Sequence, residues 1–115
     1  MTSPFAGLLF TLVRHRGVKG CMVVDERDGV IVDANLQLGV DGSAMAALAA
    51  SVYRKARRAA VAAGFGEIAF FELDAEHGRV CAAGRGGLVV VLVAESRVNV
   101  GLVRVEMLHA LEAFA

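Results

Sequence analysis

The 115-residue chain has no Trp, one Tyr, one Pro and two Cys, and these shortages exclude several classes of protein. Cys21 and Cys81 are too few for a disulfide scaffold, so we expect a reducing compartment and a cytoplasmic location. The longest apolar runs, residues 5–13 and 88–94, fall short of the about 18–20 residues that a membrane-spanning helix needs. No charged segment precedes the first run and no small-residue cleavage site follows it, so a signal peptide is not expected.

Net charge is lacking as well, because twelve Lys and Arg are balanced by twelve Asp and Glu. Nucleic-acid binding relies on excess positive charge, so nucleic acid is not an expected partner. Apolar residues are abundant instead: 57% of the chain is hydrophobic before its 13 Gly are counted, whereas about 45–50% with Gly included is typical. We expect one domain over residues 1–115, with part of this apolar surface buried against another subunit.

Hydrophobic periodicity and turn residues predict the element order α-β-β-α-β-β-β-α. A first helix is expected to begin with Ser3 as N-cap and Pro4 as its first residue, and to end at Gly17. Asp41 or Ser43 is expected to cap the second helix and Asn99 the third. The strands are expected at residues 18–25, 30–34, 67–73, 79–83 and 88–94, and the later helices at 43–63 and 100–114. This order indicates an α/β fold of the α+β sandwich type, with helices on one five-stranded, mainly antiparallel sheet.

Strand 88–94 is apolar on both faces and is expected to be a central strand of the sheet. The side chains of the first strand are expected to alternate between two faces. Val18, Met22 and Val24 are expected on one face, and Cys21 and Val23 on the other.

The long helix, residues 43–63, carries an apolar arc of about 160°, whereas a helix on one sheet needs only about 100°. The large residues at one edge of the arc, Met45, Leu48 and Val52, are expected to fill the core between helix and sheet. The small residues at the other edge are expected to admit a second helix, such as the same helix of a symmetry mate. Alternatively, the alanines are good helix formers without any partner. These small residues are Ala46, Ala49, Ala56 and Ala60.

The opposite arc of the same helix is basic, with Arg54, Lys55, Arg57 and Arg58. Two interpretations stay open. The arc is either an ordinary solvated face or a docking patch for an acidic protein surface.

No catalytic constellation is recognisable, and no cofactor is expected. Residues 84–87, Gly-Arg-Gly-Gly, lie between two strands and not between a strand and a helix, which argues against a nucleotide site. The three His fall on separate elements and form no zinc spacing with the two Cys, which are expected in the core. Turn formation explains the acidic residues of the first hairpin better than a metal site does. Those residues are Asp25, Glu26, Asp28 and Asp33.

Several local patterns resemble the roadblock/LC7 (dynein light chain roadblock-type) domain family over roughly residues 5–114. No single motif is decisive, and the resemblance is cumulative. The ending is most similar to bacterial members. The matching pieces are residues 17–24 (GVKGCMVV), the Asp28-Gly29 turn, the Ala-rich helix 43–63, strand 88–94 and residues 99–107 (NVGLVRVEM).

The resemblance implies a roadblock/profilin-like sheet in the order 2-1-5-4-3. It also implies a homodimer whose long helices pack antiparallel and whose third strands pair into a ten-stranded sheet. In this order one strand separates Cys21 from Cys81, and about 9–10 Å is too far for a disulfide. The interface residues expected on this basis are Ala46, Ala49, Tyr53, Ala56, Ala60, Phe70 and Phe71.

Roadblock/LC7 domains regulate or scaffold small Ras-like GTPases, and eukaryotic members also serve dynein. The resemblance therefore implies a non-enzymatic homodimer that binds a small Ras-like GTPase through its paired long helices. Arg54, Arg57 and Arg58 are the expected contacts. The alternative is a sensing domain that holds a small molecule between helix and sheet, and an enzyme is the third hypothesis.

Overall fold

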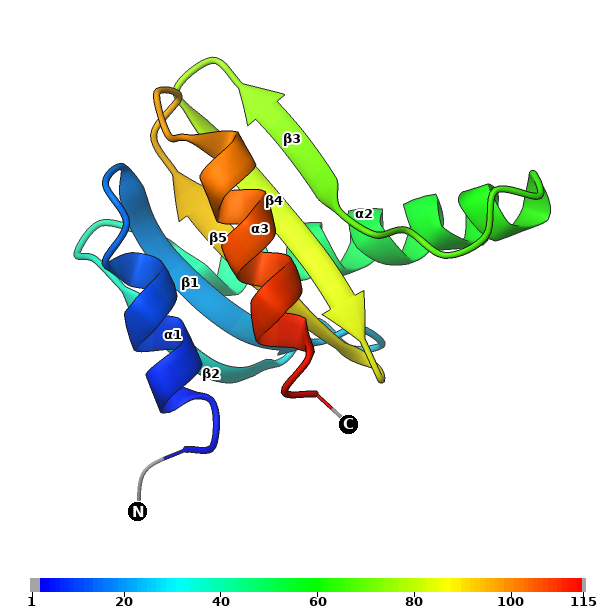
Figure 1. Ribbon diagram of the computed structural model, residues 1–115, viewed down its shortest axis with the longest axis horizontal. Helices are drawn as coiled ribbons and strands as arrows, with labels where there is room; N and C mark the ends of the chain where they lie inside the picture. The colour runs from blue at the N-terminus through cyan, green and yellow to red at the C-terminus, as the bar shows by residue number, and fades with distance from the viewer. Residues whose placement is uncertain (1–2, 115) are drawn as a thin grey trace.

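A five-stranded antiparallel sheet in the order β2-β1-β5-β4-β3 organises the chain in the computed structural model, which describes residues 3–114 (Figure 1). The element order, the sheet order and the fold class predicted above are confirmed. The elements are α1 (Ala6–Val13), β1 (Val18–Asp25), β2 (Ile31–Leu36), α2 (Gly42–Ala62), β3 (Phe71–Ala75), β4 (Gly78–Arg85), β5 (Leu88–Ala94) and α3 (Val100–Leu111).

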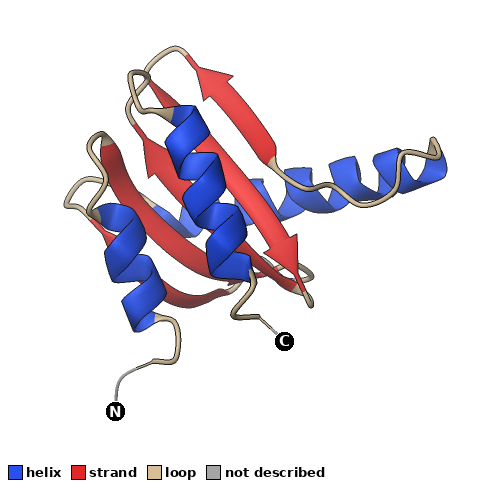
Figure 2. Cartoon of the chain, viewed as in Figure 1, coloured by secondary structure: helices blue, strands red, loops and turns tan. Residues whose placement is uncertain are grey.

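The sheet is covered by helices on both faces, α1 and α3 on one and α2 on the other (Figure 2). Side chains alternate along a strand. Cys21 and Val23 of β1 therefore enter the core under α1 and α3, while Met22 and Val24 enter the core under α2. β5 is buried in the same way on both faces. This double burial explains why these two strands have nearly continuous apolar sequences, and both match their predicted bounds.

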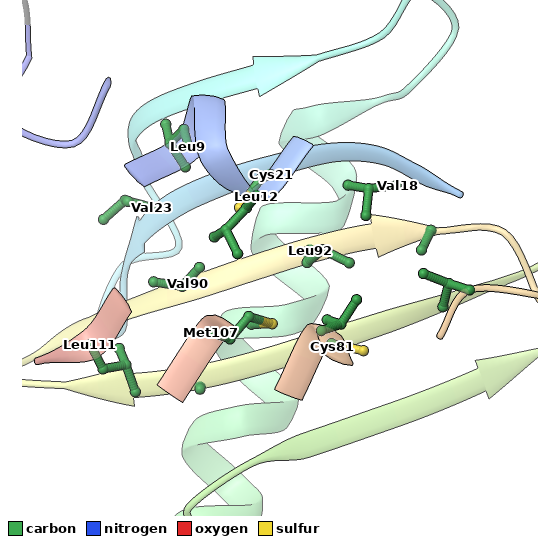
Figure 3. Packing of buried hydrophobic residues seen from close by; sticks show 14 of the residues in the cluster. Leu9, Leu12, Val18, Cys21, Val23, Cys81, Val90, Leu92, Met107 and Leu111 are labelled. Carbon is green, nitrogen blue, oxygen red and sulfur yellow. The ribbon is translucent and has the colours of Figure 1, made fainter. Parts of the chain in front are cut away.

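The core under α1 and α3 is built mainly from aliphatic side chains, with two thiols, Met107 and Phe114 among them (Figure 3). Leu12 of α1 and Met107 of α3 are fully buried there with Leu92. Cys21 and Cys81 both pair with Leu92 in the ladder from opposite sides, and both are free thiols, as the sheet order implies. Burial raises the pKa of the Cys21 thiol to about 12 and that of Cys81 to about 11.

Small residues let α2 lie close to the other face of the sheet. The helix begins where Asp41 Oδ1 accepts a hydrogen bond from the Ala44 amide at 3.1 Å, so Asp41 is the N-cap. Ala46, Ala49 and Ala50 are buried against the sheet with Tyr53. The Tyr53 ring crosses β4 at Gly84, where an added Cβ would lie 2.8 Å from the Tyr53 hydroxyl oxygen.

Three expectations about local structure were wrong. Val18 packs with the α1–α3 core and not with Met22, because the β1–β5 register shifts between Val18 and Gly20. The third strand is residues 71–75 and not 67–73, because residues 67–70 leave β4 to reach the end of α2. The N-cap of α1 is Phe5, while the Ser3 hydroxyl accepts a hydrogen bond from the Phe5 amide in the preceding turn.

The remaining bounds shift by a few residues. β2 is Ile31–Leu36 where 30–34 was expected, and β4 is Gly78–Arg85 where 79–83 was expected. Asn99 caps α3 as predicted, but the helix ends at Leu111. Phe114 beyond it is buried and lies 5.3 Å from the Phe5 ring, centroid to centroid.

α2 is longer than the sheet is wide. Its 21 residues span about 30 Å at 1.5 Å per residue, whereas five strands span about 20 Å. The helix begins on the β2 side of the sheet, and its C-terminal part therefore projects beyond β3 into the open (Figure 1).

Candidate functional site

The side of α2 that faces away from the sheet and from the basic arc carries uncovered apolar residues. Leu48 is 47% exposed, Val52 is half-buried, and Phe65 just beyond the helix is 86% exposed. The large residues expected to fill the helix–sheet core therefore lie at its margin or outside it. We call this row the outer stripe of α2: Met45, Leu48, Val52, Ala56, Ala59 and Ala63.

The wide apolar arc thus has two halves, as expected, but their roles are exchanged. The alanine edge of the arc packs on the sheet together with Tyr53, because small side chains allow the helix to approach the sheet most closely. The larger residues remain for any second helix. Ala46, Ala49 and Tyr53 were expected at a dimer interface, but the sheet of their own chain covers them. They are therefore not part of the surface that is free for a partner.

The other residues expected at an interface lie in different places. Ala56 and Ala60 are half-buried on the part of α2 near and beyond the sheet edge. Phe70 packs against the α1–α3 core, and the guanidinium carbon of Arg104 lies 5.6 Å from its ring centroid. Phe71 packs against the core under α2. The structure therefore does not bring the seven residues together on one face.

An apolar groove adjoins the outer stripe. α2 crosses the sheet without covering the corner formed by the β3–β4 hairpin, and a cavity of about 410 Å³ remains there. Leu48 of α2 forms one wall, and Leu73 of β3 and Val80 of β4 lie opposite. The sequence carried no signal for this groove, because it depends on the angle at which α2 crosses three strands.

The edge of β3 lies next to the groove and has no partner strand within residues 3–114. Its polar face carries a small charge cluster, in which Arg79 Nε lies 2.8 Å from Asp74 Oδ1 and 3.9 Å from Glu72 Oε2. A hydrogen bond to Asp74 raises the pKa of Glu72. The edge thus presents open backbone groups, and its two carboxylates are partly neutralised by one arginine.

The basic arc of α2 divides into anchored and free residues. Arg54 Nη1 donates to the carbonyl oxygens of Glu26 and Arg27 at 2.9 and 3.0 Å. Arg57 Nε donates to Glu26 Oε1 at 2.7 Å, and this hydrogen bond raises the pKa of Arg57. Both side chains fasten the β1–β2 turn to the helix, while Arg58 is exposed.

The acidic residues of the first hairpin have local roles. Asp25 Oδ1 accepts hydrogen bonds from the amides of Arg27 and Asp28, which shapes the turn. Asp33 Oδ1 accepts from the Ala34 amide on β2. In the part of the chain that the structure describes, no three His, Cys, Asp or Glu side chains are grouped so that they can hold a metal ion.

Among residues 3–114, no helix has the length and apolar character that crossing a membrane requires. The interface between α2 and the sheet is filled by the alanines and Tyr53. A ligand between helix and sheet would therefore have to displace these side chains, or bind at the margins where the cavities lie.

Comparisons with known proteins agree with the fold. The family model for the Roadblock/LC7 domain matches residues 6–93. The uncharacterized protein MJ1340 of Methanocaldococcus jannaschii is 31% identical over 105 residues, which cover 91% of each chain. A Roadblock/LC7 domain from Streptomyces avermitilis superposes with a TM-score of 0.85 at 17% identity, covering 96% of this chain and 94% of the other.

MglB of Myxococcus xanthus has the same fold, with a TM-score of 0.79 at 20% identity over 96% of this chain and 93% of its own. The matched family model spans most of the chain, from α1 to the end of β5. The chain therefore belongs to the Roadblock/LC7 domain family.

Proposed function

We propose that the chain is a homodimer that regulates or scaffolds a small Ras-like GTPase without being an enzyme itself. The observation that carries the dimer is the C-terminal part of α2, which projects past the sheet with apolar residues exposed. Phe65 is exposed at the projecting end and Leu48 is exposed over the sheet, and a second copy would cover this apolar surface.

The geometry favours a two-fold arrangement about the β3 edge. If two β3 edges pair, each projecting helix end passes over the partner's sheet, next to the partner's α2. The uncovered groove at Leu48, Leu73 and Val80 then receives the other helix end with Phe65. The same two-fold pairing places both β3 strands at the centre of a ten-stranded sheet, so neither β3 edge is left open to aggregation.

A GTPase partner follows from the family, whose members regulate or scaffold small Ras-like GTPases. We propose the arginines of the basic arc as the docking surface, because Arg54 and Arg58 lie on the side of α2 away from the outer stripe, whereas Lys55 is next to Leu48 around the helix. Arg58 is exposed and would contact an acidic partner directly. Arg54 and Arg57 would support this surface by holding the β1–β2 turn.

The experiment is a binding measurement with the purified dimer and a small Ras-like GTPase from the same organism, loaded with GDP or with a non-hydrolysable GTP analogue. Charge reversal at Arg58 should slow association and weaken affinity about tenfold, since rim charges act mainly on association. Arg97→Glu is the matched control, because Arg97 is exposed in the β5–α3 loop. Affinity that is unchanged by Arg58→Glu, or equally reduced by Arg97→Glu, would contradict docking through the basic arc.

A further inference from the structure

A recessed basic cavity lies between the β1–β2 turn, the β4–β5 hairpin and the middle of α2. Its volume is about 300 Å³, and it adjoins a second cavity of about 480 Å³, with which it shares Glu26, Arg57 and Gly87. The smaller cavity is lined by Arg27, Arg54, Arg57, Arg58, Asp25 and Glu26, together with Gly87.

The charges around this cavity do not balance. Four guanidinium groups and two carboxylates line the smaller cavity, in a chain whose net charge is zero. The adjoining cavity adds one group of each kind, Arg85 and Glu67, and Glu67 Oε1 lies 3.9 Å from Arg57 Nη1. Both carboxylates of the smaller cavity are already engaged, since Asp25 holds the amides of its own turn and Glu26 holds Arg57. Gathering like charges in one small space is unfavourable unless a counter-charge is present. The cavity therefore has an unmet preference for an anion.

Two of the arginines are fixed in position before any ligand arrives. Backbone carbonyls hold Arg54 and the Glu26 carboxylate holds Arg57, and each guanidinium keeps further N–H groups free for a ligand. Arg27 and Arg58 make no ion pair or side-chain hydrogen bond with any residue from 3 to 114. Fixed donors lose little entropy on binding, and planar guanidinium groups suit the paired oxygens of a phosphate.

We propose that this cavity binds the phosphate or diphosphate group of a small phosphorylated molecule. Arg54 and Arg57 form the floor of the site, and Arg27 and Arg58 close over the anion from the turn and the helix. The adjoining cavity, which Tyr53 and Ile68 line, has room for the rest of the molecule.

A small anion fits better than the acidic side chains of a protein partner, because the arginines are not equally accessible. The Arg57 side chain is only 32% exposed, and the Glu26 side chain that holds it is 15% exposed. A folded partner would reach Arg27 and Arg58 at the rim, whereas a phosphate reaches all four. The site lies on the side of α2 away from the outer stripe, so it does not rest on the proposed dimer.

The test is calorimetric titration of the full chain with inorganic pyrophosphate, with ionic strength held constant by NaCl. We expect saturable binding with a Kd of about 1 mM or tighter. Arg27→Gln and Arg58→Gln should each weaken it about tenfold, through the loss of one charge-assisted hydrogen-bonding group. Neither residue holds the turn, so both variants should melt at the temperature of the wild type. Arg97→Gln is the matched control and should bind pyrophosphate as the wild type does.

Three results would overturn the phosphate site. The first is no saturable binding below about 10 mM, and the second is an equal loss of binding in Arg97→Gln. The third is GTPase affinity that depends on Arg58 while pyrophosphate does not bind, because the arginines then serve only the protein partner. In each case the oligomeric state and the GTPase measurement remain separate tests of the proposed function.

Discussion

At the scale of single residues, Gly84 sets how closely α2 approaches the sheet. Its missing side chain makes room for the Tyr53 ring, whose hydroxyl oxygen lies 3.5 Å from the Gly84 carbonyl oxygen. A methyl group there would lie within 2.9 Å of ring atoms and 2.8 Å of the hydroxyl oxygen. The contact explains a glycine near the end of β4, because glycine within a strand is otherwise unfavourable.

Gly84→Ala should therefore destabilise the fold by about 1–3 kcal/mol, because overpacking displaces Tyr53 or β4. Gly7→Ala is the control, since nothing lies within 4 Å of a Cβ at that position in α1. That change should leave stability unchanged or raise it by about 0.5–1 kcal/mol. Urea denaturation of both variants checks the prediction, and a Gly84→Ala protein as stable as the wild type would show that the contact is loose.

The two buried thiols predict how stability depends on pH. The pKa values of Cys21 and Cys81 in the folded chain are about 12 and about 11, against 9.0 as the ordinary value. Folding thus favours the protonated thiols, so their contribution is complete below about pH 9 and is lost as pH rises toward 11–12. Burial also raises the pKa of Tyr53, which acts in the same direction.

Between about pH 8 and about pH 10.5, the denaturation midpoint should therefore fall further for the wild type than for Cys21→Ala. The comparison removes the effect of lysine titration, which is common to both proteins. A thiol reagent at about pH 8 should react with neither cysteine until the chain unfolds. Equal pH dependence in the two proteins would contradict burial of the Cys21 thiol.

At the scale of elements, the sequence predicts strands best where burial is two-sided. The apolar runs of β1 and β5 define their bounds, because most positions in them are buried in a core. β3 was misplaced because Ile68 and Phe70 alternate like strand residues while each packs into a different core without pairing with β4. Periodicity records which side chains are buried, but only the partner strand decides which backbone groups pair.

The apolar face of α2 shows the same limit of prediction from the sequence. Its arc of apolar residues is wider than packing on one sheet requires, but residue size did not indicate which edge of the arc packs on the sheet. Leu48 suggested the core, yet the sheet accepts the alanine edge because Tyr53 over Gly84 fills the remaining space. The cavity beside the β1–β2 turn depends on contacts between residues 26 and 57, and no local pattern predicts such a contact.

Leu48→Glu tests the role of the outer stripe at this scale. A charge there should weaken self-association at least about a hundredfold, because an unpaired carboxylate would be buried between two helices. Val32→Glu is a matched control on β2, since Val32 is 49% exposed and Leu48 is 47% exposed. Light scattering after gel filtration should show smaller particles for Leu48→Glu alone, and equal masses for both variants would argue against the stripe.

At the scale of the whole molecule, three surfaces of the same helix have different roles. One side of α2 packs on its own sheet, a second is proposed to meet the partner's α2, and the third carries the arginines. The helix can serve all three because it extends beyond the sheet (Figure 1). Pairing two chains about β3 would place both basic arcs on one assembly, which is a suitable arrangement for a scaffold.

Sedimentation equilibrium of the wild-type chain at micromolar concentration tests this account most directly. We predict a particle of twice the 12.0 kDa chain mass, or a multiple of that dimer, because apolar surface at Leu48 and Phe65 is covered only when a second chain is present. A single species of 12.0 kDa at those concentrations would contradict the central claim that α2 extends past its sheet in order to pair with another copy.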